Sequence, residues 1–286
     1  MKNIIDIHNN ILLDNPNKNN LRIMELFNNI KPNSKFKKEK IKKKTLTINK
    51  KANFKDLRYS MKKNNIVHAL CFSYQWRKNS DCIKANNFII KNIQENNYNN
   101  LSCLVVLQPK AKNSKFFLED YISKKNVLGM KIKPSWCKIK LSETKYLGPL
   151  CETLISNNKI LLTHISQGFH PNMGDNIYEL SQLLKNFPKL KVVAAHMGGG
   201  ILFYNNYAPL SKIFKNLYID ISLPSQIDWL PSLIKRYDHK KFLFASDFPY
   251  VSHEKCIESI RNLKISKEIY HDLMYYNSKN LINSCK

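Results

Sequence analysis

The stretch ILLTHISQGFHPNMGDNIYELSQLLKNFPKLKVVAAH, residues 160–196, contains two short apolar runs separated by an amphipathic segment. The runs at 160–165 and 191–196 have the length and composition of buried strands, whereas residues 176–187 repeat apolar side chains at helical spacing. A strand, helix and strand in this order pair their strands in parallel through a right-handed crossover. The stretch therefore predicts an α/β fold.

The same alternation runs along the whole chain. Further strands are predicted at residues 3–8, 66–72, 101–107, 127–133, 217–222 and 241–246, and further helices at 82–96, 146–158 and 225–237. Eight such units in 286 residues match a closed (β/α)₈ TIM barrel better than an open doubly wound sheet. An open sheet would also need a glycine-rich loop after its first strand, and DIHNNILLDN at 6–15 has no glycine. We predict one barrel domain over residues 1–286.

Residues 12–58 are too long for an ordinary connection between a strand and a helix. They contain a helix-like segment, NLRIMELFNN at 20–29, and a dense basic run, KFKKEKIKKK at 35–44. We expect this segment to be an inserted basic loop after the first strand that lies over the barrel mouth.

The net charge of +26 would fit a polyanionic partner. Lysine and asparagine are spread along the whole chain, however, so the charge reflects composition and no specific nucleic-acid partner is expected. Seven scattered cysteines without a C-x-x-C pair argue against a disulfide framework. No apolar run resembles a signal peptide or a membrane span, so we expect a cytoplasmic protein, with a homodimer as one compatible assembly.

Polar residues gather at the predicted strand ends, where barrel enzymes build their active sites. They are His8, Asn10, Lys131, Lys133, His164, His196, Asp220, Ser222 and Asp247. Imidazole and carboxylate groups are the ligands of Zn²⁺ and similar ions, so these residues predict a site for one divalent metal ion. We expect His196 to transfer protons beside it. Asp6, His8 and Asn10 share one parity and are expected to converge on the same pocket.

Two lysines on one strand face are costly to bury without a partner. Lys131 and Lys133 could bind a carboxylate or phosphate of the substrate, or pair with Asp6 or Asp220. Trp76 and Trp136 could form an apolar wall of the pocket or pack in the core. His170 and Asp175 are expected in a solvated loop.

Several motifs in order resemble those of the amidohydrolase-related family of metal-dependent hydrolases and decarboxylases. They are IIDIHNNI (4–11), GMKIKP (129–134), ILLTHISQG (160–168), FPKLKVVAAHMGGG (187–200), LYIDIS (217–222), KFLFASDFPY (241–250) and YYNSKNLI (275–282). The resemblance implies a distorted TIM barrel with one metal ion, usually zinc, at its mouth. Carried over by position, it implies metal ligands at His8, Asn10, His164 and Asp247, with His196 in proton transfer and Asp247 also catalytic.

The chain departs from the family pattern at two positions. Asn10 replaces a ligand histidine, and an amide oxygen is a poorer donor for zinc than imidazole. The site is therefore expected to be weaker, to favour Mn²⁺, or to have lost its metal. Lys133 stands where the family commonly has histidine, which adds positive charge near the pocket.

Our first hypothesis is a metal-dependent hydrolase that cleaves an amide, lactone or ester bond of a small organic substrate with a metal-activated water. The alternative is a non-oxidative decarboxylase, in which the metal and a lysine grip an anionic, carboxylated substrate. A degenerate, metal-free barrel that acts as a binding protein is the third hypothesis, and Asn10 motivates it.

Overall fold

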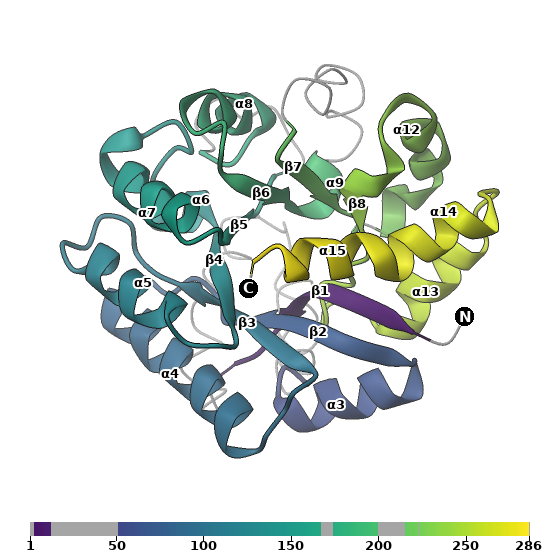
Figure 1. The fold of residues 1–286 in the computed structure, drawn as a ribbon, viewed down its shortest axis with the longest axis horizontal. Coiled ribbons are helices and arrows are strands. Elements are labelled where there is room, and N and C mark those ends of the chain that lie inside the picture. Colours follow the sequence, from purple (N-terminus) through teal and green to yellow (C-terminus); the bar gives the residue numbers. More distant parts are fainter. Residues whose placement is uncertain (1–2, 13–50, 167–173, 200–214, 223, 286) are drawn as a thin grey trace, which may run out of the picture.

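The computed structural model describes residues 3–12, 51–166, 174–199, 215–222 and 224–285. Eight parallel strands form one sheet in which the order in space follows the order in the chain (Figure 1). The strands are β1 (Ile4–Asn10), β2 (Ile66–Phe72), β3 (Leu101–Val106), β4 (Val127–Ile132), β5 (Ile160–Thr163), β6 (Lys191–Ala194), β7 (Leu217–Asp220) and β8 (Phe242–Leu243). This arrangement confirms the predicted (β/α)₈ TIM barrel.

Helices alternate with the strands, and most of them surround the barrel on its outside (Figure 1). They are α3 (Phe54–Lys63), α4 (Asn79–Glu95), α5 (Ser114–Ile122), α6 (Pro134–Cys137), α7 (Thr144–Ser156), α8 (Ile177–Asn186), α9 (Ala195–Gly199), α12 (Leu230–Arg236), α13 (His253–Arg261), α14 (Lys267–His271) and α15 (Asn277–Asn283). Side-chain caps fix several starting points: Asn53 accepts from Asp56 N before α3, and Asn176 accepts from Glu179 N before α8.

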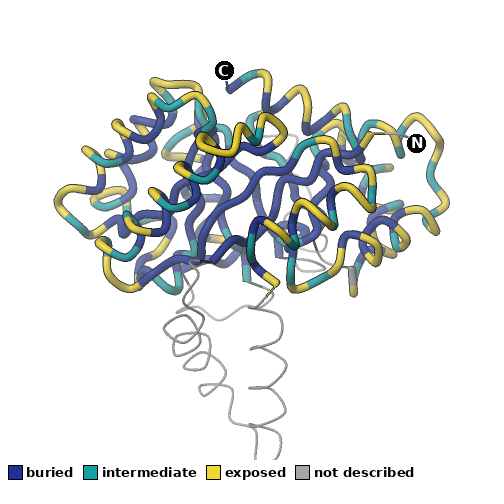
Figure 2. Tube along the Cα trace, turned by 90° about the horizontal axis from the view of Figure 1, so that it is seen from below, coloured by how far each residue is buried: buried dark blue, intermediate teal, exposed yellow. Residues whose placement is uncertain are grey.

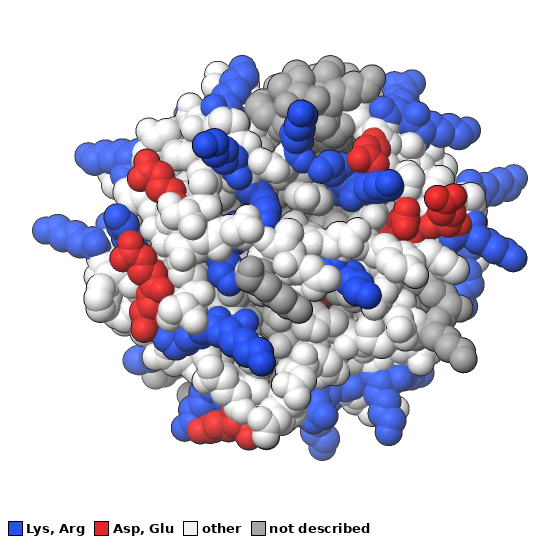
Figure 3. Space-filling view, viewed as in Figure 1, with Lys and Arg blue, Asp and Glu red and all other residues white. Residues whose placement is uncertain are grey.

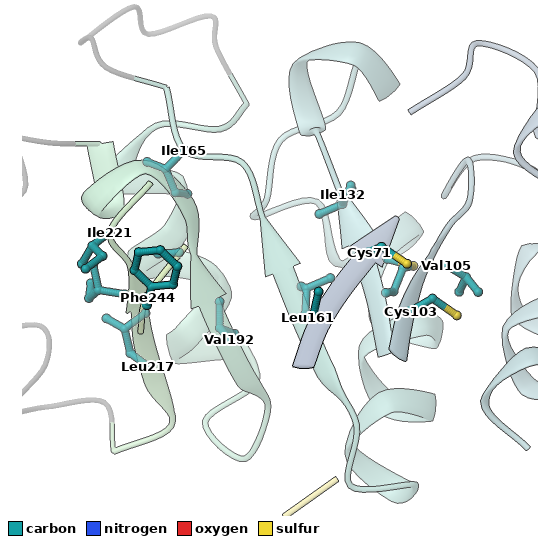
Figure 4. Packing of buried hydrophobic residues seen from close by; sticks show 14 of the residues in the cluster. Cys71, Cys103, Val105, Ile132, Leu161, Ile165, Val192, Leu217, Ile221 and Phe244 are labelled. Atoms are coloured by element: carbon teal, nitrogen blue, oxygen red, sulfur yellow. The ribbon is translucent and has the colours of Figure 1, made fainter. Parts of the chain in front are cut away.

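Two apolar layers hold the barrel together. Outward-facing strand residues such as Cys103, Val105 and Leu161 pack under the helices (Figure 4). The alternate strand residues, including Ile5 and Leu104, fill the barrel interior. Figure 2 shows the result, with strands buried along their length and helices exposed on their outer faces.

Helix α15 supplies the last piece of the interior layer. Its residues Leu281 and Ile282 belong to the same buried cluster as Ile5 and Leu104. In Figure 1 the helix crosses the end of the barrel. The interior is therefore packed at that end, and the opposite end, where the strands finish, remains for the site.

The barrel closes through a short seam between β1 and β8. Ile7 N donates to Phe244 O at 3.2 Å and Asn10 N donates to Phe248 O at 2.7 Å. Among the described residues, the β-bridge between these two edges is isolated and joins Asn9 to Phe248. The seam is thus an isolated bridge, whereas the neighbouring strands elsewhere in the described sheet pair as ladders.

The insertion after β1 is shorter than expected, because α3 already begins at Phe54. Leu12 N donates to Ala52 O at 2.8 Å, so both ends of the inserted segment meet at one point beside the barrel mouth. The helix-like segment at 20–29 and the basic run at 35–44 lie outside the described residues.

Lysine and arginine side chains are spread over the face shown in Figure 3, with acidic groups among them. This distribution agrees with a charge set by composition. All seven cysteines are buried and carry free thiols. Within the described residues, the helices are too short or too polar to cross a membrane.

Candidate active site

The strands end earlier than the sequence suggested, so most of the polar residues lie just beyond them. β4 ends at Ile132, β5 at Thr163, β6 at Ala194 and β8 at Leu243. The residues that follow these ends, with those of β1 and β7, lie at the carboxyl-terminal end of the barrel and include Lys133, His164, His196, Ser222 and Asp247.

His8 lies between two carboxylates. Its Nδ1 is 2.6 Å from Asp220 Oδ2, and its Nε2 is 3.1 Å from Asp247 Oδ1. Burial and the Lys131 ammonium act to lower the pKa of His8, but the two carboxylates outweigh them and raise it above its ordinary value of 6.5. Since Nδ1 donates to Asp220, Nε2 is the nitrogen that faces the open side of the site.

Asp220, fully buried, organises this side of the site. Its Oδ1 accepts hydrogen bonds from His196 N at 3.2 Å, from Ser222 N at 2.8 Å and from the Ser222 hydroxyl, while Oδ2 faces His8. Burial alone would raise the pKa of Asp220, but His8 and these hydrogen bonds hold it well below its ordinary value. The carboxylate therefore stays charged and fixes the orientation of His8.

The hydrogen bonds around His196 determine which of its nitrogens carries the proton. Ser222 gives its hydroxyl hydrogen to Asp220, so His196 Nδ1, at 3.0 Å from Ser222 Oγ, must be the donor of that pair. His196 Nε2 is then an acceptor, and it receives a hydrogen bond from His164 Nδ1 at 3.0 Å. Burial lowers the pKa of His196 to about 4 and that of His164 well below 6.5, so both rings are neutral.

A strained turn carries His196. His196, Met197 and Gly198 have φ values of 57°, 55° and 64°, so three successive residues adopt the left-handed conformation. This conformation costs about 1–2 kcal/mol for a residue with a side chain. Strain of this kind is typical of functional sites, where the surrounding contacts hold it in place. Here the contacts are the hydrogen bonds to Asp220 and Ser222.

Three potential metal donors converge. One donor atom each from His8, His196 and Asp247 lies within 4.8 Å of the others, which fits the chemistry of a divalent cation site. The sequence had instead grouped His8 and Asp247 with His164. In the structure His164 contacts His196 on the edge of this group, so the roles expected for the two histidines stay predictions.

Asn10 does not present its oxygen to this group. Its Nδ2 donates to Asp247 Oδ1 at 2.8 Å and to Phe248 O at 2.9 Å, so both amide hydrogens are used. A flipped amide would place its oxygen against two acceptors, which is unfavourable. In this geometry the Asn10 amide orients Asp247. Its expected part as a metal ligand stays a prediction.

We expect Asn10→Ala to weaken the binding of a divalent cation by about 10-fold, because Asp247 loses the donor that orients it. Asn10→Asp should weaken it further, since a carboxylate would face Asp247 and the Phe248 carbonyl. Isothermal titration of metal-stripped protein measures both effects. Unchanged affinity in the alanine variant would show that Asn10 does not orient the carboxylate.

Asp6 lies outside the pocket, contrary to the parity argument. A register irregularity between Asp6 and Asn9 in β1 breaks the alternation, and Ile5 and Ile7 fill the barrel interior. Asp6 accepts instead from Ser246 Oγ at 2.5 Å and from His253, at the start of α13.

Lys131 is a buried cation without a hydrogen-bond partner. Its side chain is 7% exposed, its Nζ makes no hydrogen bond with any described residue, and the Phe72 ring centroid lies 5.1 Å away. Burial lowers the pKa of Lys131 to about 8, although Asp220 and Asp247 oppose the change. No ion pair joins it to Asp6 or Asp220, so the pairing alternative finds no support among the described residues.

Lys133 lies nearer the rim. Its Nζ is 4.5 Å from the Trp136 ring centroid, and burial lowers its pKa. Trp136 meets Tyr74 edge to face at 6.3 Å, and the Tyr74 and Tyr250 hydroxyls are hydrogen-bonded to each other. These rings form an aromatic wall near the barrel mouth.

The structure also describes the surroundings of Trp76 and Asp175. Trp76 packs with Cys82, Ala85 and Val106 and bonds to Ser73, so it belongs to the core and not to the wall. Asp175 is fully buried and accepts from two serine hydroxyls, so its expected place in a solvated loop was wrong. His170 lies outside the described residues.

The residues that support the site are not evident from the sequence. Ser246 has no signal of its own, and His253 lies outside the predicted strand ends, in a helical or connecting segment. Asp220 and Ser222 were noted on the seventh strand, but only their spacing of two indicated that they act together.

Comparisons with known proteins identify the family. The profile of the amidohydrolase family matches residues 5–283. The chain therefore belongs to the amidohydrolase family, and it is an enzyme of that superfamily. No curated protein sequence matches it.

Solved structures share the fold over their whole length. A dihydroxybenzoic acid decarboxylase from a Polaromonas species, with bound manganese and the inhibitor 2-nitroresorcinol, is 14% identical with a TM-score of 0.75, covering 100% of this chain and 98% of that one. A 2,6-dihydroxybenzoate decarboxylase complexed with 2,6-dihydroxybenzoate is 10% identical, with a TM-score of 0.76 and coverage of 99% and 100%. The 5-carboxyvanillate decarboxylase from Sphingomonas paucimobilis is 12% identical, with a TM-score of 0.71 and 99% coverage of both chains.

Proposed function

We propose that the chain is a metal-dependent, non-oxidative decarboxylase of a small aromatic acid. The observation that carries the proposal is the buried Lys131 ammonium, which makes no hydrogen bond with any described residue and whose charge interacts with Asp220 and Asp247. Decarboxylases among the solved structures with this fold, two of them holding manganese, support the same choice. This reading takes precedence over the hydrolase that we placed first from sequence.

The substrate carboxylate is the group that Lys131 would receive. An ammonium that is buried without a partner is unfavourable, and a substrate anion supplies the missing hydrogen-bond acceptor. Lys133 adds a second positive charge nearer the rim. Together the lysines favour a substrate with a negative charge and disfavour a neutral amide or ester.

His8, His196 and Asp247 would hold one divalent cation, with His164 beside them. The His196 Nε2 lone pair accepts from His164 Nδ1 in this structure, so that hydrogen bond would give way to the cation. When bound, the cation supplies positive charge that polarises the substrate oxygens. Asp220 keeps His8 and His196 in place through its four hydrogen bonds. Manganese is the ion we favour, because a carboxylate oxygen of Asp247 is among the donors and two of the solved decarboxylases with this fold hold manganese. Zinc is the competing ion.

The aromatic wall would orient the substrate ring. Tyr74, Tyr250 and Trp136 offer faces and edges at the mouth, and aromatic rings prefer such edge and offset contacts.

Decarboxylation replaces CO₂ on the ring carbon with a proton. We place the proton transfer at His164, which is hydrogen-bonded to His196 and lies on the side of the two lysines, whose charges lower its pKa. The sequence had assigned this part to His196. A neutral imidazole can accept a proton from solvent and pass it to the ring carbon as CO₂ leaves.

The products decide between the two enzyme reactions. Protein loaded with Mn²⁺ is incubated with hydroxybenzoates carrying a ¹³C carboxyl group, and in parallel with amides and lactones in H₂¹⁸O. We expect labelled CO₂ in step with loss of the acid. Incorporation of ¹⁸O into a new carboxylate without CO₂ release would instead establish hydrolysis.

Lys131→Met should weaken substrate binding and stabilise the fold. Loss of a hydrogen bond between charged groups costs about 1.5–3 kcal/mol, which is roughly a 10-fold to 150-fold rise in KM. Removing an unpaired buried ammonium should raise the free energy of unfolding by about 1–3 kcal/mol. Lys133→Met, at a partly exposed position, should show smaller changes in both quantities.

The pH dependence of Lys131 has a definite sign. Its pKa in the folded protein, about 8, lies below the ordinary value of 10.5, so the unfolded chain binds more protons between these values. Wild-type stability should therefore rise over this range relative to Lys131→Met, and inhibition by benzoates should weaken above about pH 8. Equal slopes for both proteins would contradict this account.

A further inference from the structure

A buried histidine beneath the candidate site has no part in the function proposed above. His253 begins α13 and is 0% exposed. Its Nε2 lies 3.0 Å from Asp6 Oδ2 and 3.0 Å from Asn9 Oδ1, and its Nδ1 lies 2.7 Å from Ser60 Oγ on α3. The Phe248 ring stacks on the imidazole with 5.0 Å between centroids.

The neighbours of His253 decide the placement of its proton. The Asn9 amide nitrogen donates to the carbonyls of Asp6 and Leu70, so the Asn9 oxygen faces the imidazole. Asp6 likewise presents a carboxylate oxygen. His253 Nε2 therefore carries a hydrogen and donates it to the oxygens of Asp6 and Asn9. These hydrogen bonds connect α13 to β1.

Asp6 connects His253 to the backbone near two of the potential metal donors. Its Oδ1 accepts from His8 N at 2.9 Å and from Ser246 N at 3.2 Å, and its Oδ2 accepts from Ser246 Oγ at 2.5 Å. With His253, these donors surround the carboxylate. One buried anion thus holds the backbone at His8 and the residue that precedes Asp247.

Ser246 then brackets Asp247. The Ser246 hydroxyl gives its hydrogen to Asp6 and accepts one from Phe248 N at 3.0 Å, so hydrogen bonds fix the chain on both sides of Asp247. Asp247 itself has a φ of 60°, a left-handed conformation that aspartate adopts more readily than most residues with a side chain.

We propose that His253 is a positioning residue for the metal site, and that it acts through Asp6 and Ser246 to keep His8 and Asp247 in register across the barrel seam. The proposal rests on the proposed metal site and adds a residue that contacts neither the donors nor the substrate pocket. Supporting residues of this kind change metal affinity by about 10-fold to 100-fold when they are replaced.

Two replacements of His253 separate positioning from packing. His253→Phe keeps a ring that can stack on Phe248 but loses the donor to Asp6. His253→Gln places an amide donor close to the position of Nε2. His239 supplies the matched control, because its Nε2 pairs with Asp272 Oδ2 at 2.8 Å and it lies before β8, at the other end of the barrel.

The test is a titration of metal-stripped protein with Mn²⁺, in which binding is measured by calorimetry or by the electron paramagnetic resonance signal of free Mn²⁺. Urea unfolding of the same samples measures stability. We expect His253→Phe to weaken Mn²⁺ binding by about 10-fold to 100-fold, and His253→Gln to recover most of the loss. His239→Phe should lower stability without changing the affinity of the folded fraction. Ser246→Ala removes the hydrogen bond from Phe248 N and should weaken Mn²⁺ binding as His253→Phe does. If His253→Phe does not fold, Ser246→Ala provides the test in its place.

Wild-type affinity in folded His253→Phe and in Ser246→Ala would overturn the proposal, as would equal losses in the Phe and Gln variants. Because binding is read without substrate, these outcomes are independent of turnover. Wild-type protein that binds Mn²⁺ but releases no CO₂ would reject only the decarboxylase. Wild-type protein that binds no divalent ion would reject the metal site and this proposal together.

Discussion

Asp247→Asn is expected to abolish tight Mn²⁺ binding and to lower kcat/KM by about a thousandfold or more. The charge stabilisation that a bound cation gives is worth several kcal/mol, and about 1.4 kcal/mol is a factor of ten in rate. Asp247 is the carboxylate of the converging donors, and its pKa stays below its ordinary value because His8 and Asn10 outweigh the effect of burial. An amide at this position would carry no charge and would place its own NH₂ group near that of Asn10.

Metal content by elemental analysis and turnover with Mn²⁺ in excess measure the effect. Asp272→Asn is a suitable control, because Asp272 pairs with His239 away from the site. A variant at Asp247 that retains stoichiometric metal would show that the donors described here do not hold the ion.

His196→Ala and His164→Ala are expected to have different consequences. His196 contributes a donor atom to the converging group, so its loss should remove bound metal and activity together. His164→Ala should keep Mn²⁺ affinity within about tenfold, because its Nδ1 contacts His196 and not the group as a whole. It should nevertheless lower kcat by about 10²-fold to 10⁴-fold, the usual contribution of a proton-transferring side chain.

The two variants are compared by Mn²⁺ titration and by single-turnover CO₂ release at saturating metal. The opposite pattern, with metal lost in His164→Ala and kept in His196→Ala, would restore the assignment that the sequence motifs implied. Equal loss of metal in both would mean that the two imidazoles ligate the same ion.

The sequence was sufficient to predict the barrel, because strand and helix periodicities are local and eight parallel units have few ways to close. The residues at which the strands end were harder to predict. The last strand was expected at residues 241–246 but pairs only over Phe242–Leu243, and the chain beyond it curves through Asp247 to reach the mouth. Such departures depend on contacts with β1, which periodicity does not encode.

The site residues were named from their position at strand ends, and the structure brings His8, His196 and Asp247 together there. Their orientation could not be predicted, because parity fails where β1 has an irregular register between Asp6 and Asn9. The hydrogen bonds that turn Asn10 toward Asp247 also join residues far apart in the chain. Contacts between residues far apart in the chain produce no recognisable pattern of residue spacing in the sequence.

Because the candidate metal site lies at the seam between β1 and β8, a bound ion would also affect the stability of the barrel. His8 lies on the first strand and Asp247 follows the last, so an ion held by both would link the two sides of the seam. Free ion at about 100 times its dissociation constant would then add roughly 2.7 kcal/mol to the resistance of the fold. Removal of the ion by a chelator should therefore lower the free energy of unfolding, because the link between β1 and the segment after β8 would be lost.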